Sequence, residues 1–234
     1  MRLLQLQDDG GCRLVTYTAT NLPRYAILSH TWGQEHEEVT FKDIENGTGK
    51  SKRGYAKIEF CASQIRKDGL QHFWVDTCCI DKSSSAELSE ALNSMFRWYH
   101  NAAKCYVYLS DVSVNGPIQS RWFTRGWTLQ ELLAPSSVEF FSYEGELLGD
   151  KKSLESEIHE QTGIPIEALR GRPLSEFSVP ERISWAAKRE TTREEDQAYC
   201  LLGIFDVHMP ALYGERMEHA FRRLRREIFG SSCK

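Results

Sequence analysis

The sequence predicts an α/β protein, in which helices cover a mostly parallel sheet and a helical extension follows. Short apolar runs alternate with amphipathic segments over residues 1–150. Strands that alternate with helices are typical of parallel sheets joined by right-handed crossovers. After Asp150 only helical patterns remain, so we expect the α/β core to end there.

Four short apolar runs predict the strands of this sheet. Each run is bounded by polar or turn-forming residues, as expected for strands buried on both faces. The predicted strands cover residues 25–29, 73–81, 105–109 and 138–142.

Helices are predicted between these strands. Residues 58–65 follow helical spacing, and a capping box at residues 84–87 opens the next helix. A further short helix follows Trp127 and ends at Pro135. Residues 42–54 are rich in glycine and polar side chains, which predicts an exposed loop.

The extension is expected to pack on the core and to cover residues 151–230. Thr192 and Glu195 have the spacing of a capping box for its fourth helix. Residues 231–234 are expected to begin a linker to other modules of a longer chain. The predicted helices cover residues 152–161, 165–170, 180–188, 194–203 and 215–229.

The composition excludes several classes of protein. The net charge of −4 gives no basic field for nucleic acid, and no apolar run reaches the ~18 residues of a membrane span. The N-terminus is too short and too acidic for a secretory signal. The seven cysteines form no CxxC pair, which favours reduced thiols in a cytoplasmic protein.

Polar and aromatic residues follow three of the predicted strands. The carboxyl ends of parallel strands form the crevice in which open α/β sheets bind ligands, so we expect these residues to converge. Aromatic walls with few polar groups and one carboxylate favour a nucleotide or a similar flat ligand. The residues are Ser29, His30, Trp32 and Gly33 after the first strand, Asp76 in the second, and residues 110–131 after the third.

Glu131 is the carboxylate of this set, and two roles are open for it. It lies where two tryptophans and two arginines precede an apolar helix, a position from which it could face a bound ligand. Thr128 and Glu131 also have the spacing of a capping box, in which Glu131 binds the backbone of its own helix start. A helix N-terminus favours the ionised carboxylate in either role.

Other motifs have simpler explanations, which we favour. Residues 47–51 lack the first glycine of a phosphate-binding loop. His30 and Cys78 could belong to a thiol protease, but no nucleophile signature accompanies them. Asp76 and Asp81 are too few for a metal site, and the arginines of the last helix are typical of a solvated face.

Four ordered blocks resemble the signature blocks of the fungal heterokaryon-incompatibility (HET) domain. The resemblance is greatest to HET modules that precede a nucleotide-binding oligomerisation domain and WD repeats. It implies an effector of self/non-self recognition, a form of innate immunity, that triggers programmed cell death when incompatible fungal strains fuse. The blocks are residues 25–33, 74–81, 125–131 and 193–203, the last followed by 210–215.

HET domains also look like remote relatives of TIR domains, some of which cleave NAD. This similarity implies a TIR-like fold, with Ser120, Trp122 and Glu131–Leu132 at the Ser/Trp-to-Glu-Leu element of the NAD-cleaving members. The sequence departs from that pattern by extra residues between Trp122 and Glu131 and by its helical extension.

The resemblance implies hydrolysis of the nicotinamide–ribose bond, with NAD as substrate and with no cofactor or metal. The transition state is oxocarbenium-like, so Glu131 would stabilise positive charge or orient the ribose or water. In this hypothesis Trp32 and Trp127 stack on flat rings and Arg125 meets phosphate. The expected ligand-binding residues are Ser29, His30, Trp32, Gly33, Asp76, Arg125 and Trp127.

Two alternatives stay open at this point. The first is a signalling adaptor that acts by TIR-like self-association without chemistry, its exposed aromatic residues serving as interface anchors. The second is regulatory nucleotide binding without turnover, which predicts stabilisation by the ligand and no product.

Overall fold

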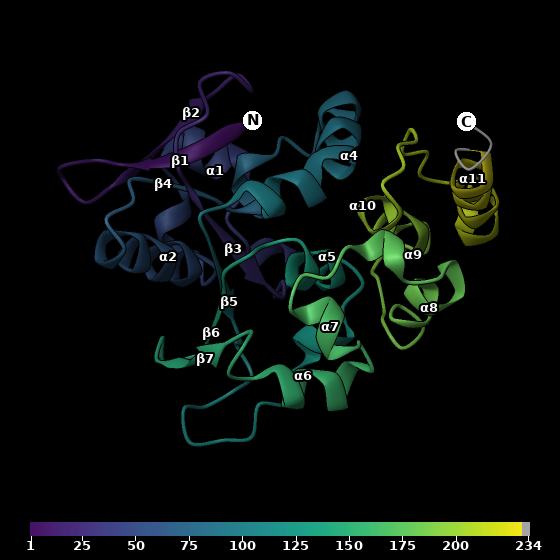
Figure 1. Ribbon diagram of the computed structural model, residues 1–234. Helices are drawn as coiled ribbons and strands as arrows, with labels where there is room; N and C mark the ends of the chain where they lie inside the picture. Colours follow the sequence, from purple (N-terminus) through teal and green to yellow (C-terminus); the bar gives the residue numbers. More distant parts are fainter. Residues whose placement is uncertain (231–234) are drawn as a thin grey trace.

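The structure, a computed structural model, describes residues 1–230 and contains a seven-stranded mixed sheet (Figure 1). The predicted linker at residues 231–234 lies outside the described residues. The order of the strands in the sheet is β2-β1-β4-β3-β5-β6-β7. The strands are β1 (Arg2–Leu6), β2 (Cys12–Thr16), β3 (Ala26–His30), β4 (His72–Trp74), β5 (Lys104–Tyr108), β6 (Val138–Phe141) and β7 (Leu147–Asp150).

The four central strands β4, β3, β5 and β6 are parallel, and this confirms the α/β fold class. All five residues of β3 are buried, because a parallel sheet is covered on both faces and its strands read as continuous apolar runs. The outer strands pair antiparallel: β1 with both β2 and β4, and β7 with β6.

Helices cover both faces of the parallel strands. Figure 1 shows α2 on one side of them, and α4 and α5 on the other. The helices of the core are α1 (Phe41–Asn46), α2 (Tyr55–Lys67), α3 (Asp76–Cys79), α4 (Ser85–Asn101) and α5 (Thr128–Leu133), with 3₁₀ turns η1 (Glu35–Glu37), η2 (Gly49–Ser51) and η3 (Arg121–Thr124).

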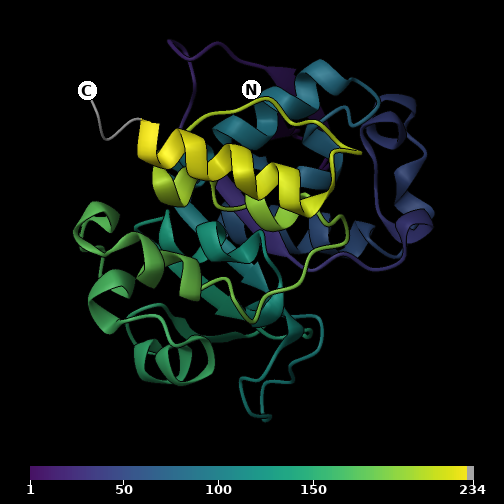
Figure 2. The same cartoon turned by 90° about the vertical axis from the view of Figure 1, so that its right-hand side faces the viewer.

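The extension is helical, as predicted, and packs on the core beside α4 and α5. Its last helix, α11, packs against α9 and lies on the outer side of the extension (Figure 2). The elements are α6 (Glu155–Thr162), α7 (Ile166–Leu169), η4 (Leu174–Glu176), α8 (Val179–Ser184), α9 (Asp196–Tyr199), α10 (Leu202–Phe205) and α11 (Arg216–Gly230).

Two predicted segments of the core are wrong. The apolar run at residues 73–81 holds a strand only as far as Trp74, after which the Val75 carbonyl accepts the Cys79 amide at 2.8 Å and α3 begins. A buried run of this length has no periodicity that separates strand from helix. The predicted loop at 42–54 contains α1, which Thr40 and Asp43 open with a capping box.

One predicted helix start is also wrong. The Thr192 hydroxyl accepts a hydrogen bond from the Arg125 guanidinium at 3.0 Å instead of capping a helix. Glu195 accepts the amide of Gly214 at 2.7 Å, and α9 begins without a side-chain cap. The expected helix at 194–203 is therefore two short helices, α9 and α10.

Candidate functional site

The candidate site lies at the carboxyl ends of β3 and β5, where the direction of strand addition reverses. From β3 the chain adds β4 on one side, then crosses back to add β5 and β6 on the other. In open α/β sheets such a reversal leaves a crevice beyond the carboxyl ends, because successive connections leave toward opposite faces.

Glu131 points to this end of the sheet. Its carboxylate Oε2 accepts a hydrogen bond from the Ser29 hydroxyl at the end of β3. The Trp122 indole donates to the same Ser29 oxygen at 2.8 Å. Ser29 and Trp122 have no exposed surface, and Glu131 is only 7% exposed. The three side chains therefore form a buried chain of hydrogen bonds, from the indole through the hydroxyl to the carboxylate.

The structure excludes the capping role of Glu131. The Thr128 hydroxyl shares its one proton between the carbonyls of Trp122 and Arg125, at 2.6 and 2.8 Å, and no amide of α5 donates to a side-chain cap. The N-cap position of α5 is Trp127, which has no side-chain cap. Thr128 thus stabilises the turn before α5, and the Glu131 side chain binds Ser29 on β3 instead of its own helix.

Burial raises the pKa of Glu131 to about 8. Hydrogen bonds from Ser29 and Tyr99 act in the opposite direction, and the negative charge of Asp76 adds to the rise. A carboxyl group with this pKa is mostly protonated at pH 7 and is ionised in about a tenth of the molecules. Glu131 is therefore suited to exchange a proton near neutral pH.

His30, Asp76, Trp32 and Gly33 lie next to this chain of hydrogen bonds. His30 is buried, and neither of its ring nitrogens has a hydrogen-bond partner among the described residues. Its Nε2 lies 3.8 Å from Asp76 Oδ1, and burial lowers its pKa, which keeps the ring neutral. The Trp32 indole donates to Asp76 at 2.9 Å. The structure thus brings together the residues predicted at the first two strand ends.

Three charged residues of this cluster, Glu38, Lys57 and Lys82, were not predicted as site residues from the sequence. Glu38 accepts the Gly33 amide at 2.6 Å and pairs with Lys57, which donates to the Thr31 carbonyl at 3.1 Å. The ammonium of Lys82 lies 3.6 Å from the centre of the Trp32 ring. No spacing pattern marks these residues, and the position of Lys82, one residue after the Asp76–Asp81 block, was the only available signal.

Arg125 and Trp127 lie elsewhere. The Arg125 guanidinium binds Thr192, and the Trp127 indole hydrogen-bonds Asp196 and lowers its pKa, although burial of that carboxyl raises it more. Both residues contact the helical extension rather than the strand ends. Ser120 also has a local partner, because its hydroxyl donates to Asp111 at 2.6 Å.

Residues 25–119 match the family model described as "Heterokaryon incompatibility protein (HET)". Over 97% of its length the chain is 58% identical to "Vegetative incompatibility protein HET-E-1" of Podospora anserina. The chain belongs to the HET family. It spans only 18% of the length of that relative, and no solved structure matches it.

The residues that match the family model include only part of the candidate site. Ser29, His30 and Asp76 lie inside the matched residues, whereas Trp122 and Glu131 lie beyond residue 119. The identity to the Podospora protein extends over almost the whole chain and so includes both parts.

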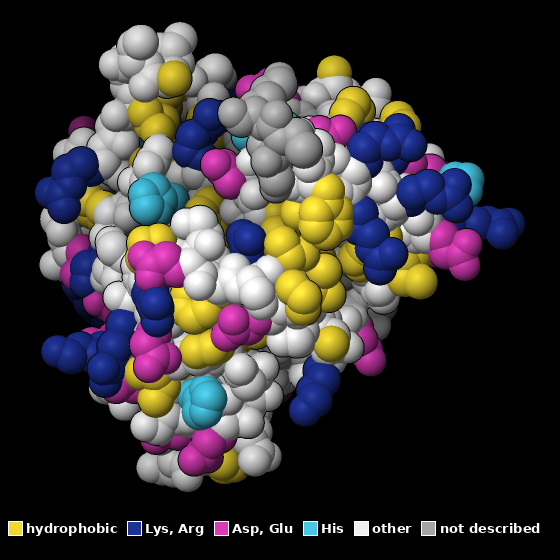
Figure 3. Space-filling model, turned by 45° about the vertical axis from the view of Figure 1, so that its right-hand side comes forward, with side chains coloured by type: hydrophobic (Ala, Val, Ile, Leu, Met, Phe, Trp, Pro, Cys, Tyr) yellow, Lys and Arg dark blue, Asp and Glu magenta, His cyan; other side chains and the backbone are white. Residues whose placement is uncertain are grey.

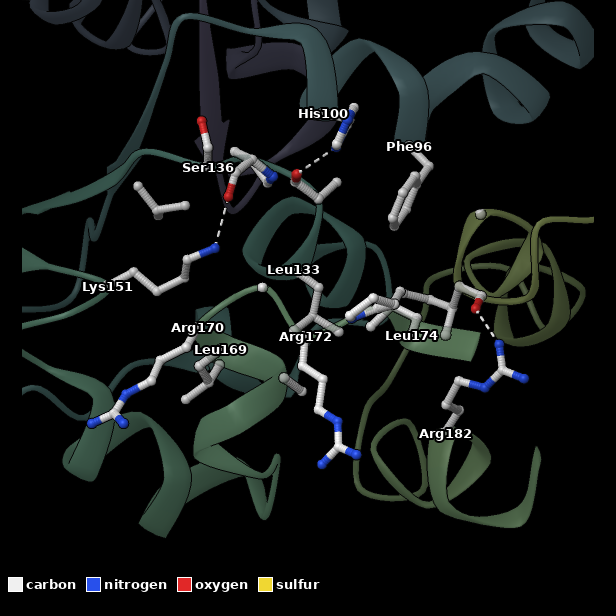
Figure 4. Close-up of a pocket in the computed structure, with 18 of the residues that line it drawn as sticks. Phe96, His100, Leu133, Ser136, Lys151, Leu169, Arg170, Arg172, Leu174 and Arg182 are labelled. Atoms are coloured by element: carbon white, nitrogen blue, oxygen red, sulfur yellow. Dashed lines mark hydrogen bonds between the residues drawn. The ribbon is translucent and has the colours of Figure 1, made fainter. Parts of the chain in front are cut away.

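A large cavity of the HET domain lies at the opposite end of the sheet, near the starts of β5 and β6. Its volume is about 1170 Å³, and none of the predicted site residues lines it. Phe96, Leu133 and Leu174 form apolar walls, while Arg170 and Arg172 point away from its centre (Figure 4). The extension closes one side of this cavity through η4, α8 and α10.

The described part of the HET domain offers no obvious metal site and no membrane span. Within residues 1–230, no three His, Cys, Asp or Glu side chains lie close enough together to hold a metal ion. No helix in the same range has the length and apolar character needed to cross a bilayer. A hydrogen bond with Cys79, followed by burial, raises the pKa of Cys78. Burial raises the pKa of Cys105 and of Cys200, and a raised pKa makes all three thiols poor nucleophiles.

Proposed function

We propose that this HET domain is the cell-death effector module of a fungal self/non-self incompatibility protein. Two findings support the proposal: the family description names heterokaryon incompatibility, and the Podospora relative is named for vegetative incompatibility. The chain corresponds to a small part of that relative, so in this proposal assembly depends on the remainder of a longer protein.

The proposed activity is hydrolysis of NAD at the nicotinamide–ribose bond. One observation supports it above the others: Glu131 reaches across to Ser29 at the carboxyl end of β3, where an open α/β sheet binds its ligand. A carboxylate at that position can stabilise the positive charge that develops on the ribose in the transition state.

The reaction balances with the groups at the site. The bond between ribose C1′ and the pyridinium nitrogen breaks, and its electron pair stays on nicotinamide, which leaves as a neutral molecule. A water oxygen bonds to C1′, and the proton it releases passes to Glu131, whose pKa of about 8 suits it as a base near neutral pH.

The test is release of nicotinamide from NAD by chains assembled through a fused oligomerisation tag. Glu131→Gln should lower the rate by about 10²–10⁴-fold, because the amide can neither carry negative charge nor accept the proton. Glu139→Gln is a matched control, since Glu139 on β6 pairs with Lys104 at the start of β5, away from the site. An undiminished rate in folded Glu131→Gln would remove Glu131 from the reaction.

A second function, that of a non-enzymatic adaptor, is favoured by the burial of the site. Glu131 is only 7% exposed, whereas several large apolar side chains are accessible at the surface. Figure 3 shows one face on which hydrophobic side chains are bordered by Lys and Arg. The exposed large hydrophobic residues are Trp32, Val114, Tyr143, Leu147, Leu212 and Phe229. Cell killing by forced oligomers without loss of NAD would favour this adaptor.

A further inference from the structure

The helical extension contacts the loop that leads into α5. The amide of Glu190 donates to the Thr124 carbonyl at 2.6 Å, and the Gly126 amide donates to the Glu190 carbonyl at 2.8 Å. A side chain at Gly126 would not fit, because its Cβ would lie 2.4 Å from Cγ2 of Thr191. Arg189 directly precedes Glu190 in the chain, so this close approach places Arg189 against the start of α5.

Arg189 is buried and has no carboxylate in direct contact. It is 7% exposed, and no carboxylate lies within 4.0 Å of its guanidinium among the described residues. Its Nη1 donates to the Arg125 carbonyl and to the Thr128 hydroxyl, both at 2.8 Å, and its Nη2 is buried without a partner. Its Nε donates to the Trp185 carbonyl at 3.2 Å. Burying a cation among neutral groups is costly, and a neutral amide could make the two hydrogen bonds of Nη1.

The charge of Arg189 faces the helix that carries Glu131. Thr128, which holds the guanidinium, and Glu131 are three residues apart in α5 and therefore lie on the same side of the helix. The positive charge lowers the pKa of Glu131, and burial lowers the pKa of Arg189 to about 10. The titratable and polar groups that act on Glu131 from the surrounding elements are Ser29 on β3, Asp76 on α3, Tyr99 on α4, Cys105 on β5 and Arg189 of the extension.

We infer that Arg189 is a positioning residue, through which the extension holds α5 in place and favours the ionised form of Glu131. The catalytic part of this inference rests on the proposed NAD hydrolysis, whereas the electrostatic part does not. It follows that residues 1–150 contain the carboxylate of the site but lack the cation that balances it.

The test compares the pH midpoint of Glu131 ionisation in variants of the full chain, followed by infrared difference spectroscopy of the carboxyl band. Glu131→Gln assigns the band. Arg189→Gln keeps hydrogen-bond donors and removes the charge. It should raise the midpoint by about one pH unit or more, which corresponds to a roughly tenfold loss of ionised Glu131 at pH 7. Arg189→Lys should restore most of the shift.

Arg182→Gln is the matched control, because this arginine of the extension donates to the Ile204 carbonyl at 2.9 Å and does not act on Glu131. An unchanged midpoint in folded Arg189→Gln would overturn the inference. If that variant does not fold, the side-chain ¹⁵N resonances of Arg189 decide. They should shift as Glu131 ionises in the wild type and stay constant in Glu131→Gln, and the absence of that shift would equally overturn it.

This experiment separates the inference from the proposed function, because no NAD is present. A shifted midpoint without NAD cleavage would leave Arg189 as the charge partner of Glu131 and remove only the enzymatic proposal. Where NAD is cleaved, the pH profile of Arg189→Gln should move toward higher pH in parallel with the infrared midpoint.

Discussion

The two ends of the parallel strands differ in both their chemistry and their space. At the carboxyl end, Trp122, Ser29 and Glu131 form a buried chain of hydrogen bonds. At the amino end lies a cavity of about 1170 Å³, near which local partners neutralise charges, as Glu139 does for Lys104. The cavity and the titratable groups are thus separated by the length of the strands, so the size of a cavity is a poor guide to the chemistry of this HET domain.

The helix α5 connects these two ends. Its first turns carry Glu131, and at its far end the ammonium of Lys151 donates to the carbonyls of Leu132 and Pro135, at 3.2 and 2.7 Å. Substitutions at either end therefore test whether the two regions depend on the same packing.

The largest effect is expected for Trp122→Ala at the carboxyl end. Trp122 has no exposed surface, packs edge-on against Phe123 and Phe140, and donates to Ser29. We expect a loss of about 3–5 kcal/mol in the free energy of unfolding, measured by urea denaturation. Trp32→Ala is the control, because Trp32 is 43% exposed and should lose ~1 kcal/mol or less. Equal losses would mean that the carboxyl-end cluster is no more tightly packed than the surface.

A smaller effect is expected from the ionisation of Glu131. Its pKa in the folded chain, about 8, lies above the value of 4.5 expected for the unfolded chain, so the folded state binds the proton more tightly. Stability should fall as the pH rises from 4.5 through 8, by about 2 kcal/mol between pH 6 and pH 8. Glu131→Gln should remove this slope in unfolding measured across the pH range, and Glu139→Gln should keep it. A slope unchanged by Glu131→Gln would assign the pH dependence to another group.

The smallest effect is expected at the amino end, for Lys151→Met. Burial lowers the pKa of Lys151 to about 8, so its contribution has the opposite sign: stability should rise between pH 8 and the ordinary lysine value of 10.5. At pH 7 the lost hydrogen bonds and the relieved burial of charge nearly offset each other, which leaves a change of ~1 kcal/mol or less. The stability of Lys151→Met, measured by thermal unfolding, should not rise between pH 8 and 10.5. The exposed control variant Lys152→Met should keep the rise. A rise that persists in Lys151→Met would contradict the assignment.

The central strands and most helices could be predicted because their signals are local. Buried parallel strands such as β3 and β5 are continuous apolar runs, and Ser84 caps α4 as its spacing predicts, accepting the Glu87 amide at 3.3 Å. The β1–β2 hairpin and β7 were missed because apolar and polar residues do not alternate along them. Leu3 and Leu4, the buried residues of β1, are adjacent, and no residue of β2 or β7 is buried.

The geometry of the candidate site could be predicted only in part. Convergence of the residues after β3 and β4 follows from parallel strand order, which sequence patterns reveal. The contact between Ser29 and Glu131 joins residues 102 positions apart, and the nearby Thr128 offered a local alternative that the fold does not use. Arg189 carries no signal of its own, because only its burial against α5 distinguishes it from other arginines.

The lack of room for a side chain at Gly126 has a practical consequence for dissecting this protein. The change in composition after Asp150 invites truncation there, but such a fragment would expose the loop that Glu190 and Thr191 cover. It would also leave the turn before α5 without the backbone pairing that fixes it. A fragment intended to preserve the surroundings of Glu131 should therefore include Arg189, Glu190 and Thr191 rather than end after β7.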